Sequence, residues 1–242
     1  MYLSIVIPAF NEAKRITETL SRIESYLKTQ GYPYEIIVID DGSTDKTGDL
    51  VRNRSAHNNA IRLLQNKKNM GKGYSVKRGM LEAQGEYLLF SDADLSTPIE
   101  EIEKLMPWFT RGYDIVIGSR GLLESNVVRH QPFYRERSGR VFNILVRFLI
   151  VKEIKDTQCG FKCFRQEAAK QVFKRQTVNG FCFDVEVIFI ATQLGYKIKE
   201  VPIAWYNSSE TKVNILIDPL KMFLDLLKIR LNFFLKRKKI TL

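Results

Sequence analysis

Two aspartates separated by a single residue, Asp92 and Asp94, follow directly on an apolar run. In an extended chain, residues two positions apart point to the same side, so both carboxylates can share one hard cation. A divalent ion held in this way would bridge to phosphate oxygens. The same residues also fit a solvated turn in which an aspartate caps the helix that Pro98 begins, and the spacing alone does not separate these interpretations.

A second acidic pair, Asp40 and Asp41, also ends an apolar run. The glycine that follows is typical of a turn, and Ser43, Thr44 or Asp45 can N-cap the next helix. Turn and cap chemistry does not require two adjacent acids at the end of a strand. We therefore expect one of the two carboxylates to be free to hydrogen-bond a nucleoside.

A glycine loop, Asn69-Met70-Gly71-Lys72-Gly73, precedes another expected helix. The backbone of such a loop can approach a phosphate, and Lys72 offers a mobile cation for it. The loop matches neither the dinucleotide-binding pattern G-x-G-x-x-G nor the P-loop pattern. By itself it is a weak indication of phosphate binding.

The elements that must position these residues alternate along the chain. β-branched runs predict strands, and the longer stretches between them predict helices. The expected strands are 3–8, 35–40, 61–64, 86–91, 114–118 and 200–205, and the expected helices are 12–28, 44–56, 73–83 and 98–109. This order predicts an α/β fold with a mostly parallel sheet and helices on both faces. Ligands of such sheets bind at the carboxyl ends of the strands, so the acidic residues gather where a ligand is expected.

The chain has 242 residues, of which 45% are hydrophobic and 27% are charged, which excludes a disordered, collagenous or disulfide-stapled protein. Its formal net charge is +11, and residues 221–242 hold seven basic residues and one acidic residue. This asymmetry predicts a basic tail that seeks an anionic surface, either a membrane or a nucleic acid. Three cysteines without paired spacing and only two histidines argue against a structural zinc site and favour a reducing, intracellular setting.

The tail predicts an amphipathic helix that begins at Asp218 and Pro219. A narrow polar stripe runs along it, apolar residues cover the rest, and four basic residues follow at 236–239. This pattern is typical of a helix lying in a bilayer interface, and packing on the domain core or in a dimer is the alternative. Residues 141–151 predict a second apolar helix, and an isoprenoid chain could lie between the two. We expect neither a signal peptide nor a transmembrane helix.

Four motifs follow one another at these strand ends: PAFNE at 8–12, DDGSTD at 40–45, NMGKG at 69–73 and SDADLSTP at 91–98. Together they resemble family 2 glycosyltransferases of the GT-A fold, which are inverting enzymes that use nucleotide sugars. Later segments extend the resemblance over nearly the whole chain: GSR at 118–120, DTQCGFK at 156–162, FDVE at 183–186 and residues 208–213. These later segments look more like the dolichyl-phosphate β-glucosyltransferase branch than like the dolichyl-phosphate mannose synthase branch.

The resemblance implies a nucleotide-sugar site and a metal site. The residues that would line the base and ribose pocket are Pro8, Ala9, Asn11, Glu12 and Asp40, and those that would complete the nucleotide-sugar site are Asp41, Gly71, Lys72 and Ala93. Asp92 and Asp94 would hold Mg²⁺ or Mn²⁺ on the diphosphate. Relatives that make mannosyl lipids often carry Gln where this chain has Ser96, which leaves the third protein ligand of the metal open. Water or a donor phosphate oxygen can fill that place.

The chemistry of the acceptor depends on its protonation. A sugar hydroxyl needs a general base, whereas a phosphate monoester, with a second pKa near roughly 6, is already largely ionised at neutral pH. Such an acceptor needs positioning and charge neutralisation instead. The candidate cations are Arg120, Arg135, Arg137 and Lys212. The resemblance implies that Arg120 and Arg135 lie near the phosphates as catalytic residues. The candidates for orienting the donor sugar or the acceptor are Asp156, Gln158, Asp184 and Glu186.

These observations predict an inverting enzyme that moves glucose from UDP-glucose onto a polyprenyl phosphate, dolichyl or undecaprenyl, at the cytoplasmic face of a membrane. Residues 1–216 would form the catalytic domain and 217–242 the membrane-surface helix, and a homo-oligomer is possible. The alternatives are transfer from GDP-mannose and transfer to a glycan hydroxyl with Asp184 or Glu186 as the base. A nucleic-acid-binding module is disfavoured, because the excess charge is mostly C-terminal and the sheet rim is acidic.

Overall fold

The computed structural model describes residues 1–129, 139, 142–148, 150, 151, 153–207 and 218–240 of the chain. The strands are β1 (Leu3–Ala9), β2 (Tyr34–Asp40), β3 (Ile61–Gln65), β4 (Tyr87–Ser91), β5 (Ile115–Ser119), β6 (Asn126–Arg129), β7 (Phe161–Arg165), β8 (Ile198–Pro202) and β9 (Ala204–Tyr206). The helices are α1 (Ile16–Gln30), α2 (Thr47–His57), α3 (Lys72–Glu82), the 3₁₀ helix η1 (Ile99–Glu101), α4 (Ile102–Thr110), α6 (Gln166–Arg175), α7 (Phe183–Gln193) and α8 (Asp218–Ile240).

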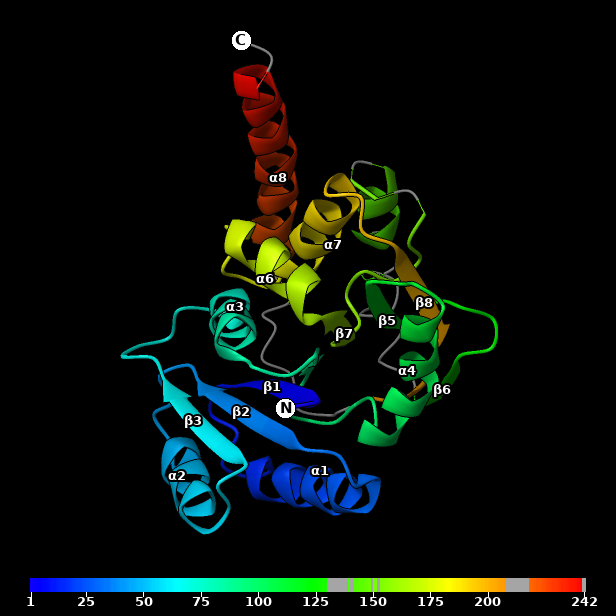
Figure 1. Ribbon diagram of the computed structural model, residues 1–242. Coiled ribbons are helices and arrows are strands. Elements are labelled where there is room, and N and C mark those ends of the chain that lie inside the picture. Colours follow the sequence, from blue (N-terminus) through cyan, green and yellow to red (C-terminus); the bar gives the residue numbers. More distant parts are fainter. Residues whose placement is uncertain (130–138, 140–141, 149, 152, 208–217, 241–242) are drawn as a thin grey trace.

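The main sheet of the described part of the chain has seven strands in the order β3-β2-β1-β4-β7-β5-β8 (Figure 1). β1 pairs in parallel with β2 and β4, and β2 pairs in parallel with β3. β7 is antiparallel to both of its neighbours, β4 and β5, so β4 and β5 run in the same direction. The predicted α/β fold with a mostly parallel sheet is confirmed.

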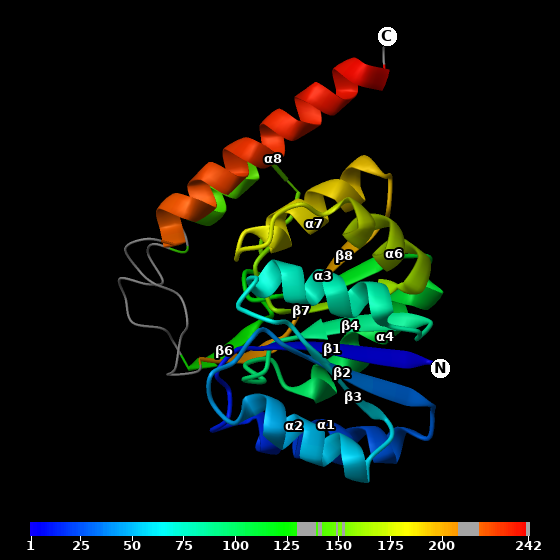
Figure 2. The ribbon, with the colours of Figure 1, turned by 90° about the vertical axis from the view of Figure 1, so that its left-hand side faces the viewer.

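Successive residues of a strand face two different hydrophobic cores. Ile5 and Ile7 of β1 lie in a core with α1, α2 and α4, whereas Val6 between them lies in a core with α3, α6, α7 and α8. Figure 2 shows α1 and α2 on one side of the sheet and α3, α6 and α7 on the other. Because both faces of the central strands are buried, these strands contain runs of apolar residues such as 5–7, 36–39 and 88–90, which is why the β-branched runs identified them.

Three elements were not predicted from the sequence, β6, β7 and α6. β7 contains Lys162, which is buried and interrupts the apolar pattern of the strand. The expected strand 200–205 is in fact two strands, β8 and β9, separated at Ile203, and β9 pairs with β6 outside the main sheet. The expected helix 12–28 begins later, at Ile16, and ends at Gln30; Arg15 is its N-cap residue, and the carbonyl of Arg15 accepts the N–H of Thr19 at 2.9 Å.

The C-terminal helix α8 packs on the protein with one face. Leu226 and Ile229 are buried in the core that α7 shares, whereas Leu224, Leu227 and Leu231 are exposed. The end of the helix extends beyond the body of the protein (Figures 1 and 2). The alternative that this helix packs on the domain core is therefore correct for one face, and a second apolar face is left uncovered. No helix in the described ranges is long and apolar enough to cross a membrane.

Candidate active site

The carboxyl ends of β1, β2 and β4 meet at one edge of the sheet, because these strands are parallel neighbours. Asp40, the last residue of β2, stands beside Ala9, the last residue of β1. Asp92 follows β4 directly, and Phe90 of that strand pairs with Val6 of β1. The acidic motifs, which lie far apart in the sequence, are therefore gathered on one rim, as the sequence predicted.

Hydrogen bonds join the loop after β1 to the loop after β2. The N–H of Asn11 donates to Ser43 Oγ at 2.9 Å, and the N–H of Thr44 donates to Asn11 Oδ1 at 2.8 Å. The N–H of Glu12 donates to Thr47 Oγ1 at 2.8 Å. Asn11 has a φ of 53°, in the left-handed region that asparagine tolerates better than most residues. The two loops thus form one interlocked wall of the site.

The remaining residues of these loops have structural partners of their own. Asp45 Oδ1 accepts the N–H of Thr47 at 2.9 Å in the turn before α2, but the N-cap position of that helix is Lys46 and no side chain caps it. Glu12 forms an ion pair with Arg15 at 2.6 Å. Pro8, which the resemblance also assigned to the nucleotide pocket, is half-buried at the end of β1.

Asp41 holds the glycine loop in place. Its Oδ1 accepts hydrogen bonds from Asn66 Nδ2 at 2.7 Å and from the N–H of Met70 at 2.9 Å, and its Oδ2 accepts the N–H of Gly71 at 2.9 Å. The carboxylate is buried. Asp41 therefore holds the backbone of the two residues that precede Lys72, and all of these contacts lie within the protein.

Asp40 is buried as well, and both of its oxygens have partners. Oδ1 accepts the N–H of Ser43 at 3.0 Å, and Oδ2 accepts a hydrogen bond from Gln65 Nε2 at 3.0 Å. Both adjacent carboxylates therefore have partners within the protein, and the expectation that one of them can hydrogen-bond a nucleoside stays a prediction. A turn and the next strand along the sheet supply donors that the sequence pattern does not reveal.

Gly71 and Gly73 are required by close packing against another segment of the protein. Gly71 has a φ of 100°, and a Cβ at this position would lie 2.4 Å from the carbonyl oxygen of Asn179. A Cβ at Gly73 would lie 2.6 Å from the Cβ of Phe183. The glycine loop therefore fits against the residues that lead into α7, and this contact fixes where Lys72 begins α3.

Lys72 reaches the aspartate pair. Its Nζ lies 2.7 Å from Asp92 Oδ1 and 5.3 Å from the centre of the Phe90 ring. Burial alone would lower the pKa of Lys72, but the charges of Asp92 and Asp184 raise it above its ordinary value. Lys72 is therefore a charged ammonium at the carboxylate pair, as its expected role as a cation for a phosphate requires.

Asp94 is held in a tight turn beside Asp92. Its Oδ1 accepts the N–H of Ser96 at 2.9 Å, and Leu95 between them has a φ of 45°. The intervening carbonyl of Ala93 accepts a hydrogen bond from Thr19 Oγ1 at 2.6 Å. Burial, and next the charge of Asp92, raise the pKa of Asp94 above its ordinary value. A carboxylate whose pKa is raised by burial and by a neighbouring carboxylate is one whose charged form a cation would stabilise.

The donor set at this turn fits a hard divalent cation. Asp92 and Asp94 provide carboxylate oxygens, which Mg²⁺ and Mn²⁺ prefer, and Lys72 already places a positive charge there. Within the described ranges, no group of three or more His, Cys, Asp and Glu side chains is arranged to hold a metal. This agrees with two protein carboxylates and with an ion that completes its shell from water and phosphate.

Arg120 and Asp156 form a two-pronged ion pair at the end of β5. Arg120 Nε donates to Asp156 Oδ2 at 2.7 Å, and Arg120 Nη2 donates to Asp156 Oδ1 at 2.9 Å. Burial alone would raise the pKa of Asp156, but the charge of Arg120 lowers it to about 2. The N–H of Gln158 also donates to Asp156 Oδ1, at 3.1 Å. Three residues predicted for the site are thus brought together, with Asp156 positioning the guanidinium.

Lys162 and Asp184 form a buried ion pair that sequence reasoning missed. Lys162 Nζ donates to the carboxylate of Asp184 and to the carbonyl of Cys159. Burial raises the pKa of Asp184, although the charges of Lys162 and Lys72 act in the opposite direction. A lysine between the apolar residues Phe161, Cys163 and Phe164 was the available signal, because a buried lysine needs an anionic partner.

Glu186 fastens the segment before α7. Its two carboxylate oxygens accept hydrogen bonds from the N–H of Thr177 at 2.9 Å, from Thr177 Oγ1 at 2.6 Å and from the N–H of Val178 at 2.7 Å. Asp184 and Glu186 therefore point to different partners, as expected for residues two apart in a helix. Three other predicted residues, Arg135, Arg137 and Lys212, lie outside the described residues, as does the motif at 208–213.

The fold has close neighbours among solved structures. Mannosyl-3-phosphoglycerate synthase from Rubrobacter xylanophilus matches with a TM-score of 0.71 and 15% identity, over 99% of this chain and 75% of that one. Glucosyl-3-phosphoglycerate synthase from Mycobacterium tuberculosis, in complex with Mn²⁺, uridine diphosphate and glucosyl-3-phosphoglycerate, matches with a TM-score of 0.67 and 20% identity, over 95% of this chain and 80% of that one. The sheet and its two helical layers therefore have the GT-A fold.

Sequence comparison gives the family. The model of glycosyl transferase family 2 matches residues 4–173. A dolichyl-phosphate beta-glucosyltransferase of Trichomonas vaginalis is 40% identical over 96% of this chain and 72% of its own length. The dolichyl-phosphate beta-glucosyltransferases of Dictyostelium discoideum and Homo sapiens are 37% and 35% identical, over 97% and 96% of this chain and 76% and 75% of their own lengths. The chain belongs to glycosyl transferase family 2.

Proposed function

We propose that this glycosyltransferase moves glucose from UDP-glucose to the phosphate of dolichyl phosphate, with inversion at the sugar carbon. The names of its relatives support the acceptor and the sugar. The donor is supported by a GT-A neighbour solved in complex with Mn²⁺ and uridine-diphosphate-glucose. The rim of the sheet in this chain has the residue types that such a reaction needs.

The observation that carries this proposal is the state of the carboxylates near the rim. Asp184 is paired with Lys162, and Glu186 accepts three hydrogen bonds from the segment before α7. Neither is arranged as a base that could take a proton from an acceptor hydroxyl. An acceptor phosphate is already ionised and needs no base, so the arrangement favours a phosphate over a sugar hydroxyl.

On the donor side, Asp92 and Asp94 would hold the divalent ion, which supplies charge neutralisation for the departing diphosphate. Lys72 begins α3, and its ammonium is within reach of Asp92. When a diphosphate is bound, this ammonium is the nearest side-chain cation to turn from the carboxylate to a phosphate oxygen. The hydrogen-bonded wall of Asn11, Ser43 and Asp40 would receive the nucleoside.

On the acceptor side, Arg120 follows β5, which runs in the same direction as β4. Burial alone would lower the pKa of Arg120, but the charge of Asp156, and less strongly that of Asp92, raises it above its ordinary value. The influence of Asp92 supports a position of the guanidinium near the proposed metal-binding turn. Asp156 holds two of its N–H groups and so fixes its plane. The remaining N–H donors of Arg120 are suited to bind the acceptor phosphate.

The acceptor is a lipid, and we propose that residues 217–242 bring the catalytic domain, residues 1–216, to the membrane surface as a peripheral enzyme. Exposed apolar side chains occur on α8 and on the helical stretch 142–148. Ile144 and Phe148 are 65% and 78% exposed, and Leu231 on α8 is 63% exposed. Exposed cations stand among them at Arg147 and Arg230. Apolar side chains interspersed with cations suit an interface with anionic headgroups.

The test is identification of the product. The enzyme is incubated with Mn²⁺, a short-chain dolichyl phosphate, and either UDP-glucose or GDP-mannose, each labelled in the sugar. The expected product is an organic-soluble β-glucosyl phosphate formed from UDP-glucose in preference to GDP-mannose. Preferential transfer from GDP-mannose would overturn the donor assignment, and label transferred to a water-soluble glycan would overturn the acceptor assignment.

A further inference from the structure

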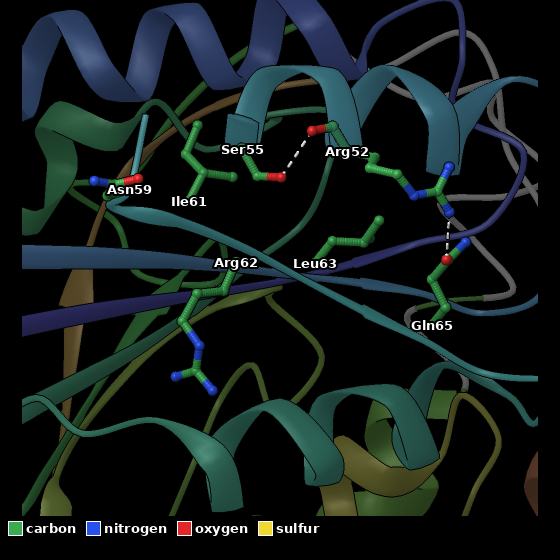
Figure 3. Close-up of a pocket in the computed structure, with 7 residues that line it drawn as sticks. All are labelled: Arg52, Ser55, Asn59, Ile61, Arg62, Leu63 and Gln65. Atoms are coloured by element: carbon green, nitrogen blue, oxygen red, sulfur yellow. Dashed lines mark hydrogen bonds between the residues drawn. The ribbon is translucent and has the colours of Figure 1, made fainter. Parts of the chain in front are cut away.

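A row of side chains leads from the outer surface of α2 to the nucleotide side of the rim. It begins in a hollow of about 520 Å³ between α2 and the edge strand β3, which Figure 3 shows. Arg52 of α2 donates from Nη2 to Gln65 Oε1 at 2.6 Å. Gln65 in turn donates from Nε2 to Asp40 Oδ2 at 3.0 Å. Asp40 is thus connected through one amide to a cation at the surface.

The two neighbours of Gln65 determine how its amide is oriented. A guanidinium is only a donor and a carboxylate is only an acceptor, so the amide oxygen must face Arg52 and the amide nitrogen must face Asp40. Arg52 is itself held by Asp49, at 2.6 Å. The row therefore has a fixed direction, and it delivers an N–H donor to Asp40.

The carboxylate of Asp40 is fixed at both oxygens. Ser43 supplies the second donor, from its backbone N–H at 3.0 Å. Each carboxylate oxygen has two lone pairs, so each keeps one for a further N–H or O–H donor. A carboxylate locked in this way presents acceptors in one orientation, which is the property needed to recognise a nucleoside.

A glycine in α2 leaves room for this arrangement. A Cβ at Gly48 would lie 2.6 Å from Gln65 Nε2 and 2.7 Å from Asp40 Oδ2. The backbone of Gly48 is not in the left-handed region, so its conformation does not call for glycine. Alanine is favoured over glycine inside a helix, so the reason for glycine here is the space that the Asp40–Gln65 pair occupies.

We propose that Gln65 is a positioning residue that orients Asp40 to accept an N–H or O–H of the donor's nucleoside, with Arg52 fixing the amide and Gly48 leaving room for it. This inference rests on the proposed function, because it assumes that a nucleotide sugar binds at the end of β2. It extends the site to three residues, Arg52, Gly48 and Gln65, that the motifs do not include.

The experiment measures binding of UDP to the full chain by calorimetry with Mn²⁺ present. Gln65→Met keeps the length of the side chain but removes the amide, and Gly48→Ala places a methyl group against the pair. Each is expected to raise the Kd for UDP about tenfold, the effect of a lost hydrogen bond to a charged group. The KM for UDP-glucose should rise in proportion, with a smaller fall in kcat.

The matched control is Arg62→Gln. Arg62 is on the same strand and lines the same hollow, but it points away from Gln65 (Figure 3) and pairs with Glu35 at 2.8 Å. It should leave the Kd for UDP unchanged. In a double-mutant cycle, Gly48→Ala should raise the Kd less in a Gln65→Ala background, because one of the two atoms that the methyl group meets is then gone.

The outcomes separate this inference from the proposed function. If UDP binds the wild type and Gln65→Met with equal Kd, the inference is overturned and the proposed function stands. If the wild type binds no UDP with either metal, both are overturned. Two supporting results identify the contact. If Gln65→Met raises the Kd for UDP but not the Kd for CDP, the contact is with the base. If it raises the Kd for both but not the Kd for 2′-deoxy-UDP, the contact is with the ribose.

Discussion

Lys72 Nζ lies 2.7 Å from Asp92 Oδ1, so an ammonium from the start of α3 sits on the carboxylate pair at the end of β4. The contact joins two motifs that are twenty residues apart in the sequence. It shows that the pair Asp92 and Asp94 attracts a cation even within the protein itself. If Asp92 and Asp94 hold a metal ion as proposed, the ion and Lys72 compete for Asp92 until a diphosphate gives the ammonium another partner.

Replacing Lys72 by methionine should therefore have opposite effects on the Kd for Mn²⁺ and on the KM for UDP-glucose. Without donor, the Kd for Mn²⁺, measured by electron paramagnetic resonance of the free ion, should fall because a competing cation is gone. With donor, the KM for UDP-glucose should rise about tenfold, because a charge-assisted hydrogen bond to phosphate is lost. Lys104→Met, which removes an exposed ion pair with Glu101, is the control. An unchanged Mn²⁺ affinity in Lys72→Met would contradict this account of the pair.

Asp94→Asn should separate activity from stability. Removing a metal-binding carboxylate should lower kcat by a factor of about 10³ or more. Because burial and Asp92 raise the pKa of Asp94, its charge opposes folding at neutral pH. The melting temperature of the variant, measured by calorimetry without metal, should therefore equal or exceed that of the wild type. Near-normal turnover with the same metal requirement would remove Asp94 from the site.

The ion pair of Arg120 and Asp156 predicts a pH dependence of stability. The pKa of Asp156 is about 2 in the folded protein, below its ordinary value of 3.8. A depressed pKa stabilises the fold above the unfolded pKa, and this contribution is lost as the pH falls from about 4 towards 2. Asp156→Asn should lower the free energy of unfolding by about 2 kcal/mol at neutral pH.

Urea unfolding between pH 7 and pH 2 measures this difference. The difference in the free energy of unfolding between the wild type and Asp156→Asn should be constant from pH 7 to about pH 5 and should become smaller below pH 4. A gap that stays constant down to pH 2 would show that the carboxylate charge of Asp156 does not contribute through Arg120.

The uncovered face of α8 predicts a separation between membrane binding and stability. Changing exposed Leu227 and Leu231 together to serine should reduce retention on anionic liposomes and activity on membrane-borne acceptor, with the melting temperature unchanged. The buried neighbour gives the matched control, because Leu226→Ser should destabilise the fold by about 3 kcal/mol. If the exposed double variant binds liposomes as the wild type does, the proposed membrane face is wrong.

The parts of the fold that follow from local rules were predictable from the sequence. Strands β1, β2 and β4 have two buried faces, so each contains an apolar run of three or four residues, and each leads into a motif that a parallel sheet must bring to one rim. β7 was missed because it contains the buried Lys162, and only a distant residue, Asp184, explains why a charge can be there.

The partners of the site residues could not be predicted, because they come from elements that neighbour one another only in space. The motif DDGSTD suggests a free carboxylate, but Gln65 and Asn66 at the end of β3 supply donors to Asp40 and Asp41. Likewise, Gly71 resembles a phosphate-loop glycine in the sequence, whereas the structure shows that it makes room for the carbonyl of Asn179. Such contacts depend on packing across the sheet, which no local pattern encodes.

The most direct measurement is release of UDP from UDP-glucose with Mn²⁺ and three matched acceptor conditions: a short polyprenyl phosphate, the corresponding polyprenol, and no lipid. We expect release that requires both the metal and the phosphate, because Asp184 and Glu186, the two candidate bases for a hydroxyl acceptor, are engaged by partners within the protein. Release with the polyprenol at a rate equal to that with the phosphate would contradict transfer to an ionised acceptor.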